Sequence, residues 1–390
     1  MKRIKTPPFA GFLIFNFAFF MMDTTAGYFS IYLNEIGMTK TEIGMITAIS
    51  SLVALCFQPM LGLLADRAKS KNQVLQILIL STALLYPLIL LSSNMFYILL
   101  LYVVYTTLRR CQPSLNNSMS LEYAEQSGIH YGPLRMMGAV GYAAMMAVVG
   151  QIANIGTKLT FTTYTAICLF NILLIFLLPK IQGHQGNGTH QPISSVLKNG
   201  SVIKLVIFAM MMSLAQGMYH SYFAIFFTSE LGGSSALYGT MLSISAMCEI
   251  PFLFFADRII RRLGTKRTLF FICIADSARW FATFFVKTPG MQIVIQSMNF
   301  LNILMGVAVS LKLSQLAAPQ FKTTVQTLAS TVQSVASLLI SSLLGGILAD
   351  TFGIRPLFLL AGGISLITAV TFHFFVFKDS LSTQAPGLEA

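Results

Sequence analysis

Long, uninterrupted apolar runs are the feature that most restricts how this chain can fold. A helix that crosses a bilayer needs about 20 consecutive, mostly apolar residues. Runs of this kind lie at approximately 9–33, 43–64, 73–92, 95–117, 132–153, 158–179, 201–228, 237–256, 268–286, 291–316, 325–348 and 355–377. They are continuous rather than alternating, which excludes a closed β-barrel. We therefore expect an all-α membrane protein with twelve transmembrane helices.

The charged residues are few, and most of them lie in the turns between these runs. Only 10% of the residues are charged, against roughly 25% in a soluble domain. The net charge of +12 would suit a nucleic-acid partner, but the basic residues form no single solvated patch. Most Lys and Arg residues of the turns fall on one side if the N-terminus is cytoplasmic. This predicts a multi-pass protein of the cell membrane, with both termini in the cytoplasm and no nucleic-acid partner.

One polar, Gly-rich segment, I-Q-G-H-Q-G-N-G-T-H-Q-P-I-S-S, divides the runs into two sets of six. It predicts an N-terminal six-helix bundle at 1–180, a cytoplasmic linker at 181–200, and a C-terminal six-helix bundle with a short tail at 201–390. Basic turns at Asp66-Arg67 and Asp257-Arg258 occupy the same place in each half. Such an internal repeat is typical of transporters, which bind their substrate between the halves.

Motifs of enzymes and of metal sites are absent from the sequence. There is no H-E-x-x-H, G-x-S-x-G or P-loop, and the five cysteines lack metal-ligand spacing. We expect neither an enzyme nor a bound cofactor or metal.

The turn G-L-L-A-D-R-A-K-S-K, which begins at Gly62, and its weaker copy F-F-A-D-R-I-I-R-R-L-G-T-K-R resemble the cytoplasmic signature of the major facilitator superfamily. Three further segments are similar to the oligosaccharide:proton symporters, the group that includes the lactose permease: F-Q-P at 57–59, R-M-M-G-A-V-G-Y at 135–142 and F-F-T-S at 226–229. The resemblance implies two rocking bundles with one central site, and we expect a monomer. It also implies a conformational gating role for the signature residues Gly62, Asp66, Arg67, Asp257 and Arg258.

Three positions match binding residues of these symporters, and a fourth lies near one. Arg135 matches an arginine that holds sugar hydroxyls, and Tyr142 falls where an aromatic residue stacks on the sugar. Arg279 matches an arginine of span nine, and Glu249 lies about one turn from a glutamate of span eight. The chain also departs from the pattern, because span four carries the amides Asn116 and Asn117 in place of a glutamate.

Of the thirteen acidic residues, three lie well inside the runs. Glu249 lies near the centre of its run, where a charge is costly and is kept for function, so we predict that it couples transport to protons. The alternative is a static ion pair with Arg279. Asp276 is a second coupling candidate, although it shares a helix face with Arg279 and could simply neutralise it. Asp23 lies among small and polar residues and is predicted to line the substrate site.

Other polar residues within the runs complete the predicted site. Gln216 and His220 form a polar patch in span seven. Lys312 is the charged residue of span ten. Lys312, Arg109 and Arg110 could either attract an anionic substrate or extend their charged ends to the cytoplasm.

The function predicted from these features is secondary active transport by alternating access. We expect proton-coupled uptake, or symport, of a sugar or similar small polar solute. The alternatives are a carrier of a small organic anion such as an aromatic acid, a drug/proton antiporter, and a receptor built on a transporter scaffold. A central cavity with surplus positive charge would favour the anion.

Overall fold

The computed structural model describes residues 9–67, 70–128, 131–179, 200–316 and 329–373, and all regular structure within these ranges is helical. Helices bond their own backbone N–H and C=O groups, as hydrocarbon requires. The predicted linker at 181–200 lies outside the described residues, apart from Gly200, where α8 begins.

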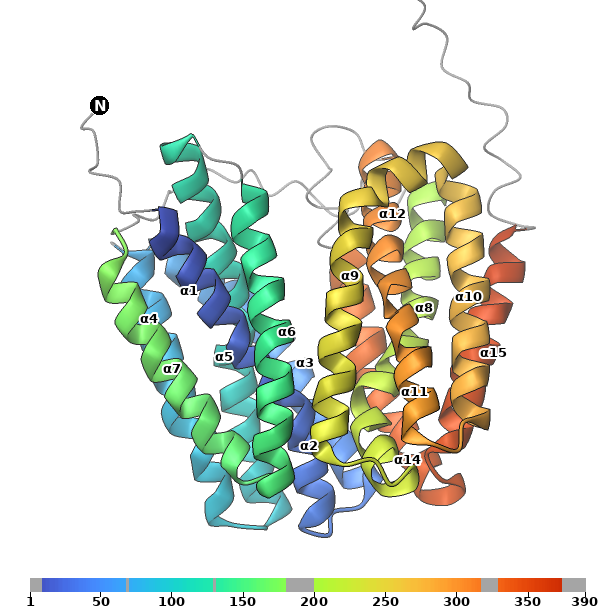
Figure 1. Ribbon diagram of the computed structural model, residues 1–390, viewed down its shortest axis with the longest axis horizontal. Coiled ribbons are helices and arrows are strands. Elements are labelled where there is room, and N and C mark those ends of the chain that lie inside the picture. The colour runs from blue at the N-terminus through green and yellow to red at the C-terminus, as the bar shows by residue number, and fades with distance from the viewer. Residues whose placement is uncertain (1–8, 68–69, 129–130, 180–199, 317–328, 374–390) are drawn as a thin grey trace, which may run out of the picture.

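The first six helical segments lie in one group (Figure 1). They are α1 (Phe9–Met21) with the 3-10 turn η1 (Met22–Thr25) and α2 (Ala26–Glu35), α3 (Lys40–Arg67), α4 (Lys71–Leu88) with η2 (Ile89–Leu91), α5 (Met95–Ser127), α6 (Tyr131–Ile155), and α7 (Leu159–Leu177).

The remaining segments lie in a second group beside the first (Figure 1). They are α8 (Gly200–Ile225) with the π-turn η4 (Phe226–Glu230), α9 (Ser235–Leu263), α10 (Thr265–Phe285), α11 (Pro289–Gln296) with η5 (Ser297–Asn299) and α12 (Phe300–Leu316), the π-segment η7 (Val335–Ile340) with α14 (Ser341–Phe352), and α15 (Arg355–Thr371).

The predicted number of transmembrane helices is confirmed. In the described part of the chain, nine helical segments are long and apolar enough to cross a membrane. The long helices α5 and α9 and the shorter apolar helix α15 bring the total to twelve. The structure extends α5 to Ser127 and α9 to Leu263, beyond the predicted ends at 117 and 256. Apolar runs mark only the part of a helix in hydrocarbon, whereas backbone hydrogen bonds continue beyond it.

Among the described residues, the two groups pack closely at one end of the molecule (Figure 1). We call this the closed end; α2 ends and α3 begins there, at the bottom of Figure 1. The opposite end, where α1 and α6 begin, is called the open end. At the closed end, α6 packs along α9 and α3 packs along α14.

Glycines allow this close approach. A Cβ at Gly239 would lie 2.7 Å from the Cα of Gly150 across the α6–α9 contact. In the α3–α14 contact, a Cβ at Gly44 would lie 2.3 Å from the carbonyl oxygen of Ser342. Small residues are what brings helix backbones together where there is no hydrophobic driving force between helices. Close packing at the closed end therefore depends on the absence of side chains at these glycines.

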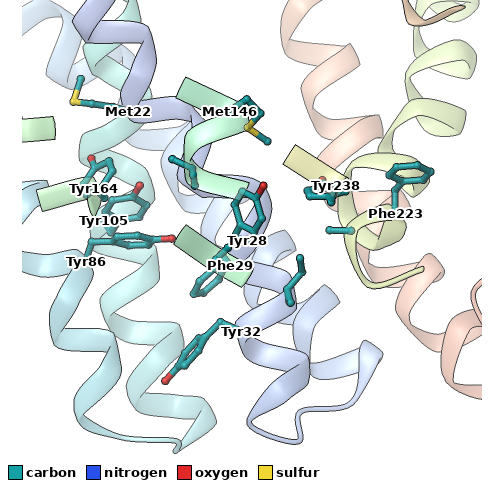
Figure 2. Packing of buried hydrophobic residues seen from close by; sticks show 14 of the residues in the cluster. Met22, Tyr28, Phe29, Tyr32, Tyr86, Tyr105, Met146, Tyr164, Phe223 and Tyr238 are labelled. Carbon is teal, nitrogen blue, oxygen red and sulfur yellow. The ribbon is translucent and has the colours of Figure 1, made fainter. Parts of the chain in front are cut away.

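Aromatic residues fill the space beside the α6–α9 contact. The rings of Tyr28 and Tyr238, one from each group, meet edge to face at 5.5 Å between centroids (Figure 2). The hydroxyl of Ser243 on α9 donates to the carbonyl of Ala143 on α6 at 2.7 Å. These contacts seal the closed end against the passage of a solute.

Asp350, near the end of α14, caps a helix of the other group. Its carboxylate accepts hydrogen bonds from the backbone N–H groups of Lys40 and Thr41, at 2.9 and 2.7 Å. These are the first residues of α3, whose N–H groups have no partner within the helix. The cap exists only while the two groups are in contact, so it stabilises the closed end specifically.

We expect Asp350→Ala to loosen the closed end. Loss of a helix N-cap costs about 0.5–2 kcal/mol, so amide hydrogen exchange at the start of α3 should become about tenfold faster. Thr351→Ala is the matched control, because the Thr351 hydroxyl bonds to Ile347 and Leu348 of its own helix. Equal exchange rates in the two variants would contradict this role for Asp350.

Candidate functional site

A central cavity lies between the two groups. It consists of two adjoining volumes, of about 960 and about 510 Å³, which share the lining residues Asp23, Tyr142, Ala246 and Glu249. The larger volume reaches the exposed first turn of α6 at Gly132. The cavity is therefore accessible from the open end, and the seal at the closed end separates it from the opposite side.

Asp23 reaches the cavity because span one is broken at its middle. The 3-10 turn η1 carries Asp23 between α1 and α2, where its carboxylate lines both volumes. One carboxylate oxygen forms an ion pair with Arg109 of α5, which also donates to Gln112 at 3.1 Å. Arg109 is buried and so does not extend to the cytoplasm. The pair neutralises a guanidinium that would otherwise be an unpaired buried charge.

Arg135 and Tyr142 line the cavity from α6. The guanidinium of Arg135 lies over the ring of Phe20, 4.6 Å from its centroid. Tyr142 follows Arg135 by seven positions, which is about two turns, so both side chains lie on one face of the helix. Arg135 and Tyr142 thus present a cation and a phenol to the cavity from the α6 wall.

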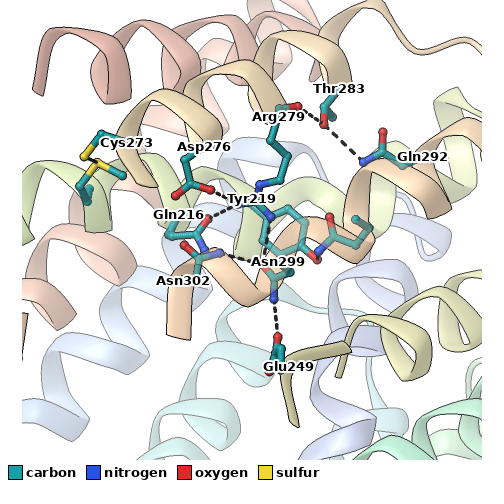
Figure 3. Close-up of polar contacts among 12 residues, drawn as sticks. Gln216, Tyr219, Glu249, Cys273, Asp276, Arg279, Thr283, Gln292, Asn299 and Asn302 are labelled. Carbon is teal, nitrogen blue, oxygen red and sulfur yellow. Dashed lines mark hydrogen bonds and ion pairs between the residues drawn. The ribbon is translucent and has the colours of Figure 1, made fainter. Parts of the chain in front are cut away.

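Glu249 enters the opposite wall from α9. The amide group of Asn299 donates to its Oε1 at 2.7 Å, and the amide oxygen of Asn299 accepts from Arg279 at 2.9 Å (Figure 3). Glu249 and Arg279 are therefore linked through Asn299, and the direct ion pair considered from the sequence is not formed.

Arg279 is instead paired with Asp276 on its own helix, at 3.1 Å. Both side chains are almost fully buried, and neither residue is among those that line the central cavity. The guanidinium also lies over the ring of Trp280, 4.1 Å from its centroid. Trp280 is buried and contacts Tyr219, so it packs within the protein rather than facing the cavity.

Only one of the other predicted binding residues lines the cavity. His220 lines the smaller volume, whereas Gln216 accepts from Arg279 at 3.3 Å. Asn116 is buried and donates to Asn16, and Asn117 accepts from Tyr131 at 3.1 Å. Lys312 is half-buried on α12 and is not a lining residue of either volume.

The predicted gating residues lie mostly outside the described side chains. Gly62, Asp66 and Arg67 belong to α3, and Asp257 belongs to α9, but the structure describes none of their side chains. Arg258 is described and is exposed on α9. Their gating role remains a prediction.

The role of Asn299 and the pairing of Arg109 were not predicted from the sequence. Span ten was expected to offer only Lys312, yet its 3-10 turn η5 places Asn299 between Glu249 and Arg279. Two amides three residues apart, Asn299 and Asn302, lie on one side of a helix near the middle of this run, and this was the signal available. Nothing in the sequence pairs Arg109 with Asp23, which is 86 residues away.

Charged, hydrogen-bonding and aromatic side chains line the central cavity. Its charged lining residues are two acids, Asp23 and Glu249, and one base, Arg135. Within the described ranges, no group of three or more His, Cys, Asp or Glu residues could hold a metal ion. Acceptors, donors and aromatic rings converge on the space between the two groups, which is the usual composition of a small-molecule site.

Comparison with known proteins places this architecture among transporters. The chain is 25% identical to the maltose permease of Geobacillus stearothermophilus, over 89% of each chain. It is 21% identical to the raffinose permease of Escherichia coli, over 97% of this chain and 94% of the permease. The crystal structure of the nucleoside transporter NupG superimposes with a TM-score of 0.82 at 16% identity, covering 93% of this chain and 98% of NupG.

These relatives are transporters and not enzymes, and their shared architecture is the major facilitator fold. The model of the MFS_1 like family matches residues 9–360. The chain is thus a multi-span membrane transporter that belongs to the MFS_1 like family, and within the major facilitator superfamily it is similar to the oligosaccharide:proton symporters.

Proposed function

We propose that this protein is a proton-coupled symporter that takes up a neutral sugar or a similar polar solute by alternating access. The observation that carries the proposal is the charge of the central cavity. Arg279 and Lys312 do not line it, and the acids Asp23 and Glu249 are balanced by Arg135 and by Arg109, which pairs with Asp23. A cavity without surplus positive charge disfavours a small organic anion and suits a solute with many hydroxyl groups.

The family relationship supports the same substrate class. The maltose and raffinose permeases are both named for sugars, and Tyr142 offers an aromatic ring on which a sugar can stack. Glu249 is the coupling residue in this proposal, because its carboxylate faces the cavity and is held by an amide rather than by a cation. Asp23 and Arg135 bind the solute.

The orientation follows from the Lys and Arg residues. We place the open end at the cytoplasm of the cell, with both termini on that side. The structure then represents the inward-open state of a monomeric carrier in the cell membrane. Uptake requires a second state in which the closed end opens and the open end closes.

Vesicles reconstituted with the purified protein test the proposal. We expect an inward proton gradient to drive accumulation of a labelled disaccharide, and a protonophore to abolish it. A nucleoside and an aromatic acid, supplied in parallel at equal concentration, should not accumulate. Accumulation of either one without the sugar would reassign the substrate, and accumulation that persists with the protonophore would exclude proton coupling.

A further inference from the structure

One amide connects the candidate coupling residue to a buried ion pair. Asn299 lies on η5, between α11 and α12, and contacts Glu249 of α9 on one side and Arg279 of α10 on the other (Figure 3). Through Arg279 it is joined to Asp276. Three helical segments therefore meet at a single side chain.

The orientation of this amide is determined by chemistry. A guanidinium has donors only, so the Asn299 oxygen must face Arg279, where it accepts at 2.9 Å. The NH2 group then points at Glu249 and donates at 2.7 Å. The Asn299 amide cannot turn over to accept a hydrogen bond from protonated Glu249 without losing its bond to Arg279.

This fixed orientation makes Asn299 sensitive to the charge of Glu249. A hydrogen bond to an ionised carboxylate is roughly twice as strong as one between neutral groups. When Glu249 is ionised, its Oε1 accepts a strong hydrogen bond from the amide of Asn299. A proton on Glu249 must lie on Oε2, because Oε1 faces a donor, and the neutral carboxyl group then accepts a weaker hydrogen bond. The protonated side chain is then free to turn toward a solute in the cavity that it lines.

The position of η5 supports this reading. A 3-10 stretch within a transmembrane helix often marks a functional hinge, and this one separates the short helix α11 from α12 at the level of Glu249. Because η5 contacts α9, a movement of the Glu249 side chain is transmitted directly to the break in span ten.

We propose that Asn299 is a positioning residue that holds ionised Glu249 against the Arg279–Asp276 pair and releases it on protonation. The inference rests on the proposed coupling role of Glu249 and adds to it how the charge of that residue reaches a neighbouring helix. Asn299 lines the smaller volume of the cavity but contributes no proton, and we expect the solute to bind without it, through Asp23 and Arg135.

The test compares Asn299→Leu with Gln216→Leu. Gln216 bonds to Arg279 but is not bonded to Glu249, so it controls for loss of a hydrogen bond to Arg279. We expect Asn299→Leu to lower gradient-driven accumulation by about tenfold while exchange of solute without a gradient keeps its KM within about threefold. Gln216→Leu should retain accumulation. Asn299→Gln, which keeps an amide, should recover part of it.

A double variant separates positioning from a general structural defect. Glu249→Gln already reduces accumulation to background, so the double variant is compared by exchange of solute without a gradient. Since Asn299 acts through Glu249, adding Asn299→Leu to Glu249→Gln should leave this exchange at the level of Glu249→Gln alone. A further loss of exchange in the double variant would overturn the inference. So would an Asn299→Leu protein in which exchange falls as much as accumulation.

Infrared titration of the purified protein gives a readout that needs no transport. The carboxyl band absent from Glu249→Gln reports Glu249, and its midpoint should move by at least about one pH unit in Asn299→Leu and stay in place in Gln216→Leu. The other charged or titratable groups around this carboxylate remain the same in both variants: Asp23 on η1, Arg135 and Tyr142 on α6, Tyr219 and His220 on α8, and Arg279 on α10.

The two proposals fail in different ways. The parent protein could show no gradient-driven accumulation while the infrared midpoint still shifts in Asn299→Leu. That result would contradict proton-coupled transport and still support the connection between Asn299 and Glu249. Proton-driven accumulation by the parent, with an unmoved midpoint in Asn299→Leu, would overturn the inference alone.

Discussion

Glu249→Gln is expected to bind solute and exchange it across vesicles, yet to fail to accumulate it against a gradient. Glutamine keeps the shape of the side chain and can still accept a hydrogen bond from Asn299, so the cavity keeps its form. Glutamine cannot gain or lose a proton, so the inward and outward movements of the carrier are no longer coupled to proton movement. Accumulation under a proton gradient should fall to the level seen with a protonophore, a loss of at least about tenfold.

Glu42→Gln is the control for this experiment. Glu42 bonds to the backbone and hydroxyl of Thr39 at the start of α3, away from the cavity-lining residues, and glutamine can serve the same capping role. This variant should accumulate solute as the parent does. If Glu249→Gln still concentrates solute, the coupling role moves to Asp23 or Asp276.

A side chain at Gly44 is expected to force the closed end open and to stop transport. In Gly44→Leu, the Cβ would lie 2.3 Å from the carbonyl oxygen of Ser342 and 2.5 Å from the hydroxyl of Tyr222. No adjustment of rotamers relieves a clash with the backbone, so α3 and α14 must separate. The two groups would then be held apart at this end, and uptake should fall by more than about tenfold.

A cysteine in the other contact reports whether the whole end opens. Tyr238 on α9 is buried at 5% exposure, and Tyr238→Cys would be labelled by a membrane-impermeant maleimide only if α6 and α9 also separate. The more accessible Cys56 and Cys248 are replaced by serine in this background. We expect rapid labelling in Gly44→Leu and slow labelling without it.

Gly363→Leu is the matched substitution. Gly363 lies within α15, and a Cβ there meets no atom within 4 Å. This variant should transport normally and leave the cysteine protected. If Gly44→Leu also leaves it protected, the two contacts at the closed end open independently, and rigid movement of the two groups is wrong.

The positions and number of the transmembrane helices could be predicted from the sequence, as could the superfamily. Both depend on information that is local in the chain. About twenty apolar residues suffice to span hydrocarbon wherever they lie, and the signature beginning at Gly62 is a short continuous motif. The list of buried charges, including Asp23, Glu249, Asp276 and Arg279, followed for the same reason, because an ionisable residue inside an apolar run is visible at once.

Which of these charges pair, and which face the solute, was decided by the tertiary structure alone. One residue along a helix turns the side chain by about 100°, so the partner of a buried group depends on the rotation and tilt of helices distant in the chain. Arg109 meets Asp23 across 86 residues, and Asp350 caps α3 across 310. The 3-10 turn at Asn299 inserts an amide where the sequence alone left a direct Glu249–Arg279 pair open. Apolar length is a property of one segment, whereas ion pairs and a cavity belong to several segments at once.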